Sequence, residues 1–191
     1  MSLILLGILN SQAAAAGGAA AYDLLETQVL TSSASSVTFT GLDSYSDYKH
    51  LQIRYTIQYI NGTTGTTAMN LQFNNDTGSN YAKHQLTGNG STVTSGATTS
   101  SSNIQLSDAG TRPSETSFGA GVIDILDFSS SAKNTTIKAL YGAITPSEDY
   151  VYLTSGLWNS TSAVTSIKHF SVSGFSFATG SRFSLYGIKG A

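Results

Sequence analysis

Apolar and polar residues alternate with a period of two through most of the chain from Tyr22 onward, a pattern that predicts half-buried β-strands. The clearest run covers residues 50–59, where odd-numbered positions are apolar and even-numbered positions are polar. It ends at Asn61-Gly62, which predicts a turn because both residue types tolerate a positive φ. We therefore expect a strand with an apolar face of Leu51, Ile53, Tyr55, Ile57 and Tyr59 and a polar face of His50, Gln52, Arg54, Thr56 and Gln58.

The same pattern predicts about ten strands in all. Residues 118–128 and 135–145 are longer and more apolar than the others, so we expect central strands that are buried on both faces. The polar segment 91–102 shows no such pattern and is expected to be a loop. The remaining expected strands are 22–30, 36–40, 69–73, 81–86, 104–106, 150–153, 164–177 and 182–188.

No helical period of ten or more residues interrupts these strands between Tyr22 and Ala191. The sequence therefore predicts an all-β fold, an antiparallel β-sandwich of the jelly-roll type. We expect residues 22–191 to form this single domain, which is long enough to bury a substantial core without disulfides.

Residues 1–21 differ from the rest of the chain, because an apolar run is followed by an Ala- and Gly-rich stretch. A secretory signal peptide is one interpretation, although no Lys or Arg precedes the apolar run. A second is an arm or short helix that docks into a partner subunit, and a third is an arm that packs on its own domain. We favour the docked arm, with an Ala/Gly linker behind it. Its expected assembly contacts are Leu3, Ile4, Leu5, Leu6, Ile8 and Leu9.

Composition narrows the range of functions. Charged residues make up 10% of the chain and the net charge is −2, so there is no basic footprint for nucleic acid. The absence of Cys excludes a disulfide scaffold, a thiolate zinc site and a cysteine nucleophile. The apolar runs are shorter than the roughly 20 residues that span a bilayer, so we expect no membrane partner. Disorder is disfavoured because 40% of the residues are hydrophobic and 10% are aromatic.

Candidate catalytic groups are few. His50, His84 and His169 are far apart in the sequence, so we expect neither a metal site nor a cofactor. Asp124 and Asp127 are three residues apart, which places them on opposite faces of a strand, and a buried Asp124 needs a hydrogen-bonding partner. There is no Gly-x-Ser-x-Gly elbow. We therefore expect that the protein is not an enzyme.

Three further features allow more than one interpretation. The loop Asn74–Asn80 is rich in oxygen ligands, so it is either a calcium loop or a hairpin held by Asx-turns. Glu148-Asp149 is expected to be a solvated turn after Pro146. The rings of Tyr150, Tyr152 and Trp158 either stack on a glycan from an exposed platform or fill the core or a subunit interface.

Several segments together resemble a group of virion structural proteins of tailed bacteriophages, common among aquatic and cyanobacterial phages. They are LGILNSQ (6–12), FNNDTGSNY (73–81), HQL (84–86), IDILDF (123–128), SGLW (155–158), AVTSI (163–167) and FATGSRFSLYGIK (177–189). The resemblance covers most of the chain, implies a virion component and carries over no catalytic residues.

The resulting functional expectation is a structural subunit of a tailed-phage virion, either a capsid decoration or cement protein or a tail or fibre-attachment subunit. It would dock by the apolar N-terminal arm. Its expected partners are further copies of itself, in a homotrimer, and other virion proteins. Assembly would take place in the reducing host cytoplasm, which suits a Cys-free sandwich. The alternative is a carbohydrate-binding module for host attachment, and a glycan hydrolase ranks last.

Overall fold

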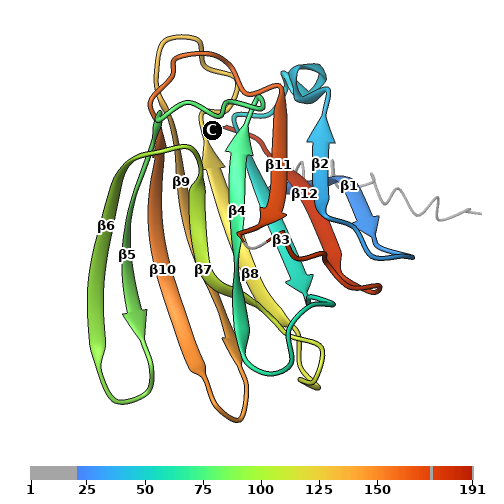
Figure 1. Ribbon diagram of the computed structural model, residues 1–191. Helices are drawn as coiled ribbons and strands as arrows, with labels where there is room; N and C mark the ends of the chain where they lie inside the picture. The colour runs from blue at the N-terminus through green and yellow to red at the C-terminus, as the bar shows by residue number, and fades with distance from the viewer. Residues whose placement is uncertain (1–20, 173, 191) are drawn as a thin grey trace, which may run out of the picture.

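The computed structural model describes residues 21–172 and 174–190, which form two antiparallel β-sheets and one short 3-10 turn, η1 (Leu42–Tyr45) (Figure 1). The expected N-terminal arm lies outside these residues, apart from its last residue. The strands of the described part are β1 (Tyr22–Val29), β2 (Ser36–Thr40), β3 (His50–Ile57), β4 (Thr66–Phe73), β5 (Tyr81–Gly88), β6 (Val93–Ser101), β7 (Ile104–Thr111), β8 (Gly119–Leu126), β9 (Thr135–Ile144), β10 (Asp149–Trp158), β11 (Ser166–Ser171) and β12 (Arg182–Ile188).

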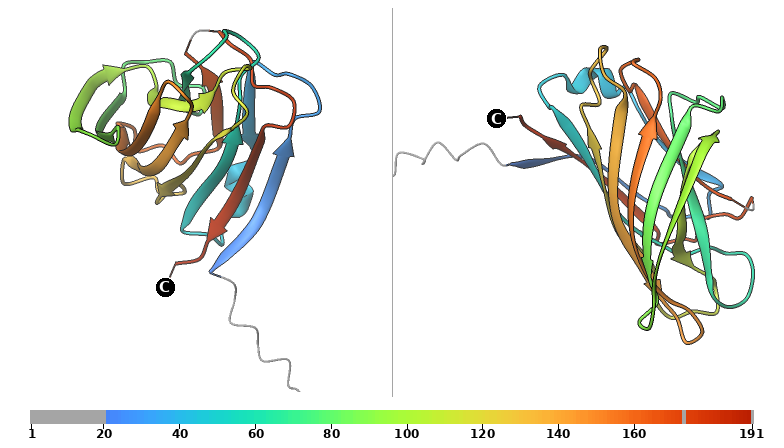
Figure 2. Two further views of the ribbon diagram at one scale, coloured as in Figure 1. Left: turned by 90° about the horizontal axis from the view of Figure 1, so that it is seen from below. Right: turned by 90° about the vertical axis from the view of Figure 1, so that its left-hand side faces the viewer.

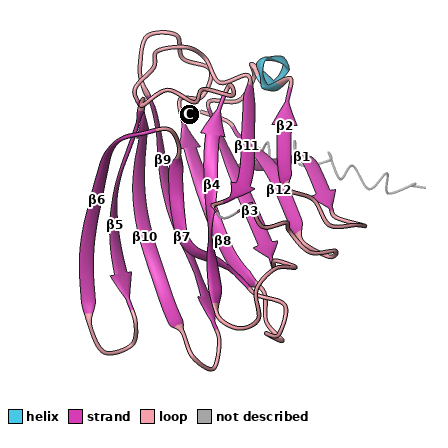
Figure 3. Cartoon of the chain, in the orientation of Figure 1, coloured by secondary structure: helices cyan, strands magenta, loops and turns pink. Residues whose placement is uncertain are grey.

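Eight of these strands form a jelly roll. They lie in two layers, with the orders β1-β12-β3-β8 and β2-β11-β4-β7 (Figure 3). Along the chain, consecutive members of this set alternate between the layers at every step except β4 to β7. This is the order of two interlocked Greek keys, and it confirms the predicted antiparallel sandwich of the jelly-roll type.

The other four strands widen one layer. The hairpin β9–β10 lies beside β8, and β5 and β6 continue the sheet beyond β10, so this sheet has eight strands in the order β1-β12-β3-β8-β9-β10-β5-β6. β1 and β6 are its two edges and lie at opposite ends of the molecule (Figure 1). β7 contacts β8, β9, β10 and β5, so the smaller sheet covers only one face of the widened part (Figure 2).

The core lies between the sheets and is rich in aromatic rings. Phe73 packs against Trp158, with ring centroids 5.5 Å apart, and Phe177 contacts both Tyr59 and Phe183 at 5.3 Å and 5.2 Å. The predicted apolar face of β3 and the following residues is buried in this core, which confirms that prediction. The alternation seen in the sequence is therefore the alternation between core and surface.

Three expectations about individual strands were wrong. Residues 93–101 form β6 rather than a loop, and the expected strand 164–177 shortens to β11. β8 and β9 are not buried on both faces, because Leu140 and Ile144 of β9 are 58% and 72% exposed. The second apolar face of these two strands therefore has no cover within the described part of the chain.

Candidate functional site

The most distinctive surface is the outer face of the widened sheet, over β8, β9, β10 and β5. Direct cross-strand pairing places Val122 opposite Leu140, Leu140 opposite Leu153, and Leu153 opposite Leu86. Four aliphatic side chains thus form one row across four strands, on the face opposite the core. Alternate residues such as Tyr141 and Tyr152 point the other way and are buried.

Further apolar residues extend this row along the strands. Val151 lies two residues from Leu153, Ile144 lies four residues from Leu140, and Val93 pairs with Gly88 of β5. We call the whole set the outer apolar face; its members are Leu86, Val93, Val122, Leu140, Ile144, Val151 and Leu153. Six of the twelve large hydrophobic side chains that are exposed in the described residues belong to it. Such a concentration makes this face a candidate interaction surface, whereas scattered exposed apolar residues would not.

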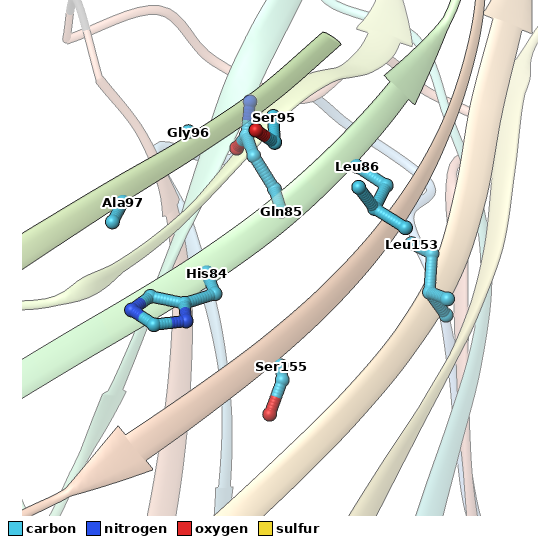
Figure 4. A pocket seen from close by; sticks show the side chains of 8 residues that line it. All are labelled: His84, Gln85, Leu86, Ser95, Gly96, Ala97, Leu153 and Ser155. Atoms are coloured by element: carbon cyan, nitrogen blue, oxygen red, sulfur yellow. The ribbon is translucent and has the colours of Figure 1, made fainter. Parts of the chain in front are cut away.

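A shallow groove of about 570 Å³ runs over this face where the β5–β6 hairpin curves (Figure 4). Leu86 and Leu153 lie side by side in it, with the His84 ring and the Ser155 hydroxyl in the next row. Its lining residues are His84, Gln85, Leu86, Ser95, Gly96, Ala97, Leu153 and Ser155. The lining offers aliphatic contact and a few hydroxyl and imidazole groups.

Charged and polar residues border the outer apolar face on one side. Lys138 pairs with Asp124 and lies opposite Ser155 in the row next to Leu140. Asp124 accepts a hydrogen bond from Gln52, with Nε2 2.7 Å from Oδ1, which confirms that this carboxylate has a specific partner. Beyond it, Arg54 lies over the rings of Tyr22 and Tyr186. The apolar surface therefore stops at β8 and gives way to a polar surface over β3 and β12.

The aromatic residues proposed for glycan contact do not form an exposed platform. Tyr152 and Trp158 are 4% and 3% exposed, and Tyr150 is half-buried against the core. Trp158 packs on Phe73 and Tyr81 and donates its indole N–H to Asp76, with 2.7 Å between Nε1 and Oδ2. These rings fill the core, which was the second of the two interpretations, and leave no flat aromatic surface for a sugar.

The loop Asn74–Asn80 contains an Asx-turn at Asp76, and Asn74 ties it to a second loop. Asp76 accepts hydrogen bonds from Gly78 N, Asn80 Nδ2 and Trp158 Nε1, and these lower its pKa, with the indole contributing most. Asn74 Oδ1 accepts from the backbone N–H groups of Thr165 and Ser166. The side-chain oxygens of Asn74 and Asp76 are therefore held by protein donors, and the turn interpretation accounts for these two residues.

The three histidines lie apart in the fold. His50 on β3 accepts a hydrogen bond from Asp127 N at 2.9 Å, and His84 lies in the groove on β5. His169 on β11 is fully buried, and burial lowers its pKa to about 3. Among residues 21–172 and 174–190, no group of three or more His, Asp or Glu side chains is arranged to hold a metal ion.

Sequence reasoning missed a cluster of carboxylates around Gly65 and Thr66. Thr66 Oγ1 lies 2.7 Å from both Asp108 Oδ1 and Glu148 Oε2, and Thr66 N donates to Glu148. Glu115 accepts from Gly65 N at 2.7 Å. Glu148 is thus a structural residue rather than part of a solvated turn. Only the fold brings these side chains together, because they come from four separate segments of the chain.

The carboxylates of the cluster are engaged by hydrogen bonds within the protein. Tyr152 donates to the second oxygen of Asp108, and burial together with this hydrogen bond raises the pKa of Tyr152. The remaining contacts of the three carboxylates are to backbone N–H groups and the Thr66 hydroxyl, and none of them lines the groove. The cluster ties the loop between β3 and β4 to β7 and to the turn between β9 and β10.

Comparison with protein families, with curated proteins and with solved structures finds no match to this chain. Within the described residues there is no helix of the length and apolarity needed to cross a membrane.

Proposed function

We propose that the protein is a structural subunit of a tailed-bacteriophage virion, at a capsid decoration, tail or fibre-attachment position. The observation that carries this proposal is the outer apolar face, which residues 21–172 and 174–190 leave open to solvent. Surfaces of this kind are characteristic of proteins that work in assemblies. The resemblance of seven sequence segments to phage virion proteins supplies the kind of assembly.

Energetics support a role for this face in association. Four strands about 4.8 Å apart, with side chains along about 20 Å of each strand, present on the order of 400 Å². Covering this area is worth about 10 kcal/mol before the costs of association and ordering. The segment Leu3–Leu9 contributes six further apolar side chains to each subunit. The face and this segment together would give each subunit two apolar contacts within a shell or a tail.

The fold is compatible with a mechanical role. Five of the eight jelly-roll strands have a paired strand on each side, and the carboxylate cluster fixes loops at the end of the sandwich. Low charge and the absence of Cys allow the same fold to form in a reducing cytoplasm and to pack closely with copies of itself. The protein would act by binding and positioning other subunits.

The test compares three full-length, tagged versions supplied during infection, followed by mass spectrometry of gradient-purified particles. The native sequence should co-purify with particles in fixed stoichiometry. Leu5→Asp/Leu6→Asp should lose incorporation, because charges in the apolar segment oppose its burial. Asn10→Asp/Gln12→Glu adds the same charge outside the apolar positions and should incorporate normally. Absence of the native protein from particles would refute the virion proposal, and normal incorporation of the first variant would refute the role of the arm.

A further inference from the structure

We propose that the outer apolar face of one subunit binds the apolar N-terminal segment, residues 3–9, of a second copy of the chain, so that copies join head to tail. The inference deepens the proposed structural function and rests on it, because it names the partner of the face. Both surfaces belong to the same chain, so no other protein is required for this contact.

The two surfaces match in size and chemistry. The row Val122–Leu140–Leu153–Leu86 crosses four strands, about 15 Å from the first to the last. The segment of residues 3–9 reaches at most about 23 Å when extended, and six of its seven residues are Leu or Ile. Neither surface carries a charged residue, and the groove beside Leu86 and Leu153 offers space for branched side chains.

The sequence of the face independently indicates a cover. β8 and β9 have the composition of strands that are buried on both faces, but the smaller sheet covers only one of them. Ile144 and Leu140 remain 72% and 58% exposed. A cover for the second face would therefore have to come from outside the residues that form the sandwich.

The size of the face favours a segment over a second face. A face of about 400 Å² is half of the about 800 Å² per partner that a stable protein–protein interface buries. Two outer faces packed on each other would thus form a weak dimer. A segment that wraps into the groove adds its own contacts at the edges and needs no second flat surface.

The placement of the two surfaces favours a second copy over the same subunit. The segment joins the domain at β1, at one edge of the eight-stranded sheet, while the groove lies at β5 and β6, at the other edge (Figure 1). Between them lies the polar surface of β12 and β3, where Arg54 covers Tyr22 and Tyr186. To reach the groove, a chain's own segment would have to carry its linker across about six strand spacings, about 29 Å, whereas a neighbour's segment need not cross this polar surface.

The N-terminal segment and the groove belong to opposite edges of the sheet, so a contact between them joins two different surfaces and is heterologous. Such contacts generate a closed ring when the rotation between neighbours returns to the first copy. The twelve residues 10–21 span at most about 40 Å, which leaves room for the rotation that a trimer requires. The predicted homotrimer is thus one closed form of this exchange.

Cysteine cross-linking tests the contact directly, because the native chain contains no Cys. Two full-length variants, Leu6→Cys and Leu153→Cys, are mixed and treated with a short bismaleimide. We expect a cross-linked dimer in the mixture and at least a tenfold lower yield in either variant alone. Adding Leu140→Asp to the Leu153→Cys partner should reduce the yield roughly tenfold, since the charge must be buried. Ile60→Asp, which adds a charge at an exposed loop position, is the matched control and should leave the yield unchanged.

Other results would overturn the proposal in recognisable ways. A double variant with both cysteines that cross-links within one chain at high dilution would show that each subunit covers its own face. Dimers of Leu153→Cys alone would show that two faces pack together. Circular dichroism and thermal unfolding of each variant check that the sandwich is intact, which we expect because Leu140 and Leu153 are exposed.

The cross-link and the particle experiment fail independently. In one outcome, Leu5→Asp/Leu6→Asp loses incorporation into particles while Leu6→Cys forms no cross-link to Leu153→Cys. That pair of results would show that the segment binds another virion protein. It would support the structural function and refute the outer apolar face as the binding site of the segment. A specific cross-link in a protein that is absent from particles would support the contact between copies and refute the virion function.

Discussion

His169 is a polar side chain with no polar partner. It lies on β11, fully buried and stacked on Phe183 with ring centroids 5.4 Å apart, and neither ring nitrogen makes a hydrogen bond. Burial disfavours the charged imidazolium and lowers the pKa to about 3. The folded state therefore excludes a proton that the unfolded chain binds below pH about 6.5.

This burial makes stability depend on pH. Because the folded pKa is below the unfolded one, stability should fall as pH decreases from about 6.5 towards 3, by up to about 1.4 kcal/mol per pH unit from this residue. His169→Leu should remove that dependence and stabilise the protein at pH 7 by about 1 kcal/mol, since two unpaired nitrogens are lost. Urea unfolding between pH 4 and 7 measures the difference. His84→Gln, at an exposed position, should retain the native dependence, and equal slopes in His169→Leu and the native protein would contradict the prediction.

Asp76 is the residue on which the loop Asn74–Asn80 depends. Its carboxylate accepts hydrogen bonds from Gly78, Asn80 and the buried indole of Trp158. Asp76→Ala should lower the free energy of unfolding by about 1–3 kcal/mol, because the Trp158 N–H loses its acceptor in the core. Thr77→Ala, in the same exposed loop, should change it by less than about 0.5 kcal/mol. Thermal unfolding with and without calcium measures both effects. Stabilisation by calcium that is lost in Asp76→Ala would instead support a cation site.

Close packing of elements makes some glycines irreplaceable. A Cβ on Gly119, at the start of β8, would overlap the Ala109 carbonyl oxygen and lie 2.6 Å from Gly110 Cα on β7. These are backbone atoms that cannot rotate away, so Gly119→Ala should destabilise the protein by about 1–3 kcal/mol or force the sheets apart. Gly96→Ala on β6 is the matched control, because its nearest contact would be Gln85 Cγ at 3.8 Å. Chemical denaturation of the two variants tests this, and equal stabilities would show that β7 and β8 separate easily.

Strands could be predicted from the sequence where one of their faces is buried. β2 and β12 begin and end at the predicted residues because burial imposes the alternation that reveals them. β6 was missed for the same reason: side chains 93–100 are exposed, so nothing selects for apolar residues at alternate positions. The sequence showed that segments 118–128 and 135–145 are apolar on both faces. It did not show which of the two faces is left uncovered, because that depends on strand order. Strand order and the carboxylate cluster both depend on contacts between residues far apart in the chain, which no local pattern reveals.

At the scale of the whole molecule, stability should decrease from the jelly roll towards the β5–β6 hairpin. β3 and β8 have neighbours on both sides and lie under the smaller sheet, whereas β6 pairs only with β5. β1 is also an edge strand, but Leu25 packs against the core and Thr27 bonds to Ser184. Local opening costs less free energy where fewer apolar contacts are lost.

Hydrogen exchange followed by mass spectrometry can measure this gradient. Amides of residues 93–101 should exchange first, those of β1 should follow, and those of β3 and β8 should exchange last, more than about 100-fold slower than β6. β1 is the internal control, because it is an edge strand with some of its side chains partly buried. Exchange of β6 at the rate of β3 would mean that the eight-stranded sheet opens as one unit. The predicted gradient would instead leave the jelly roll as the rigid part and the groove-bearing hairpin as the part that adjusts when a partner binds.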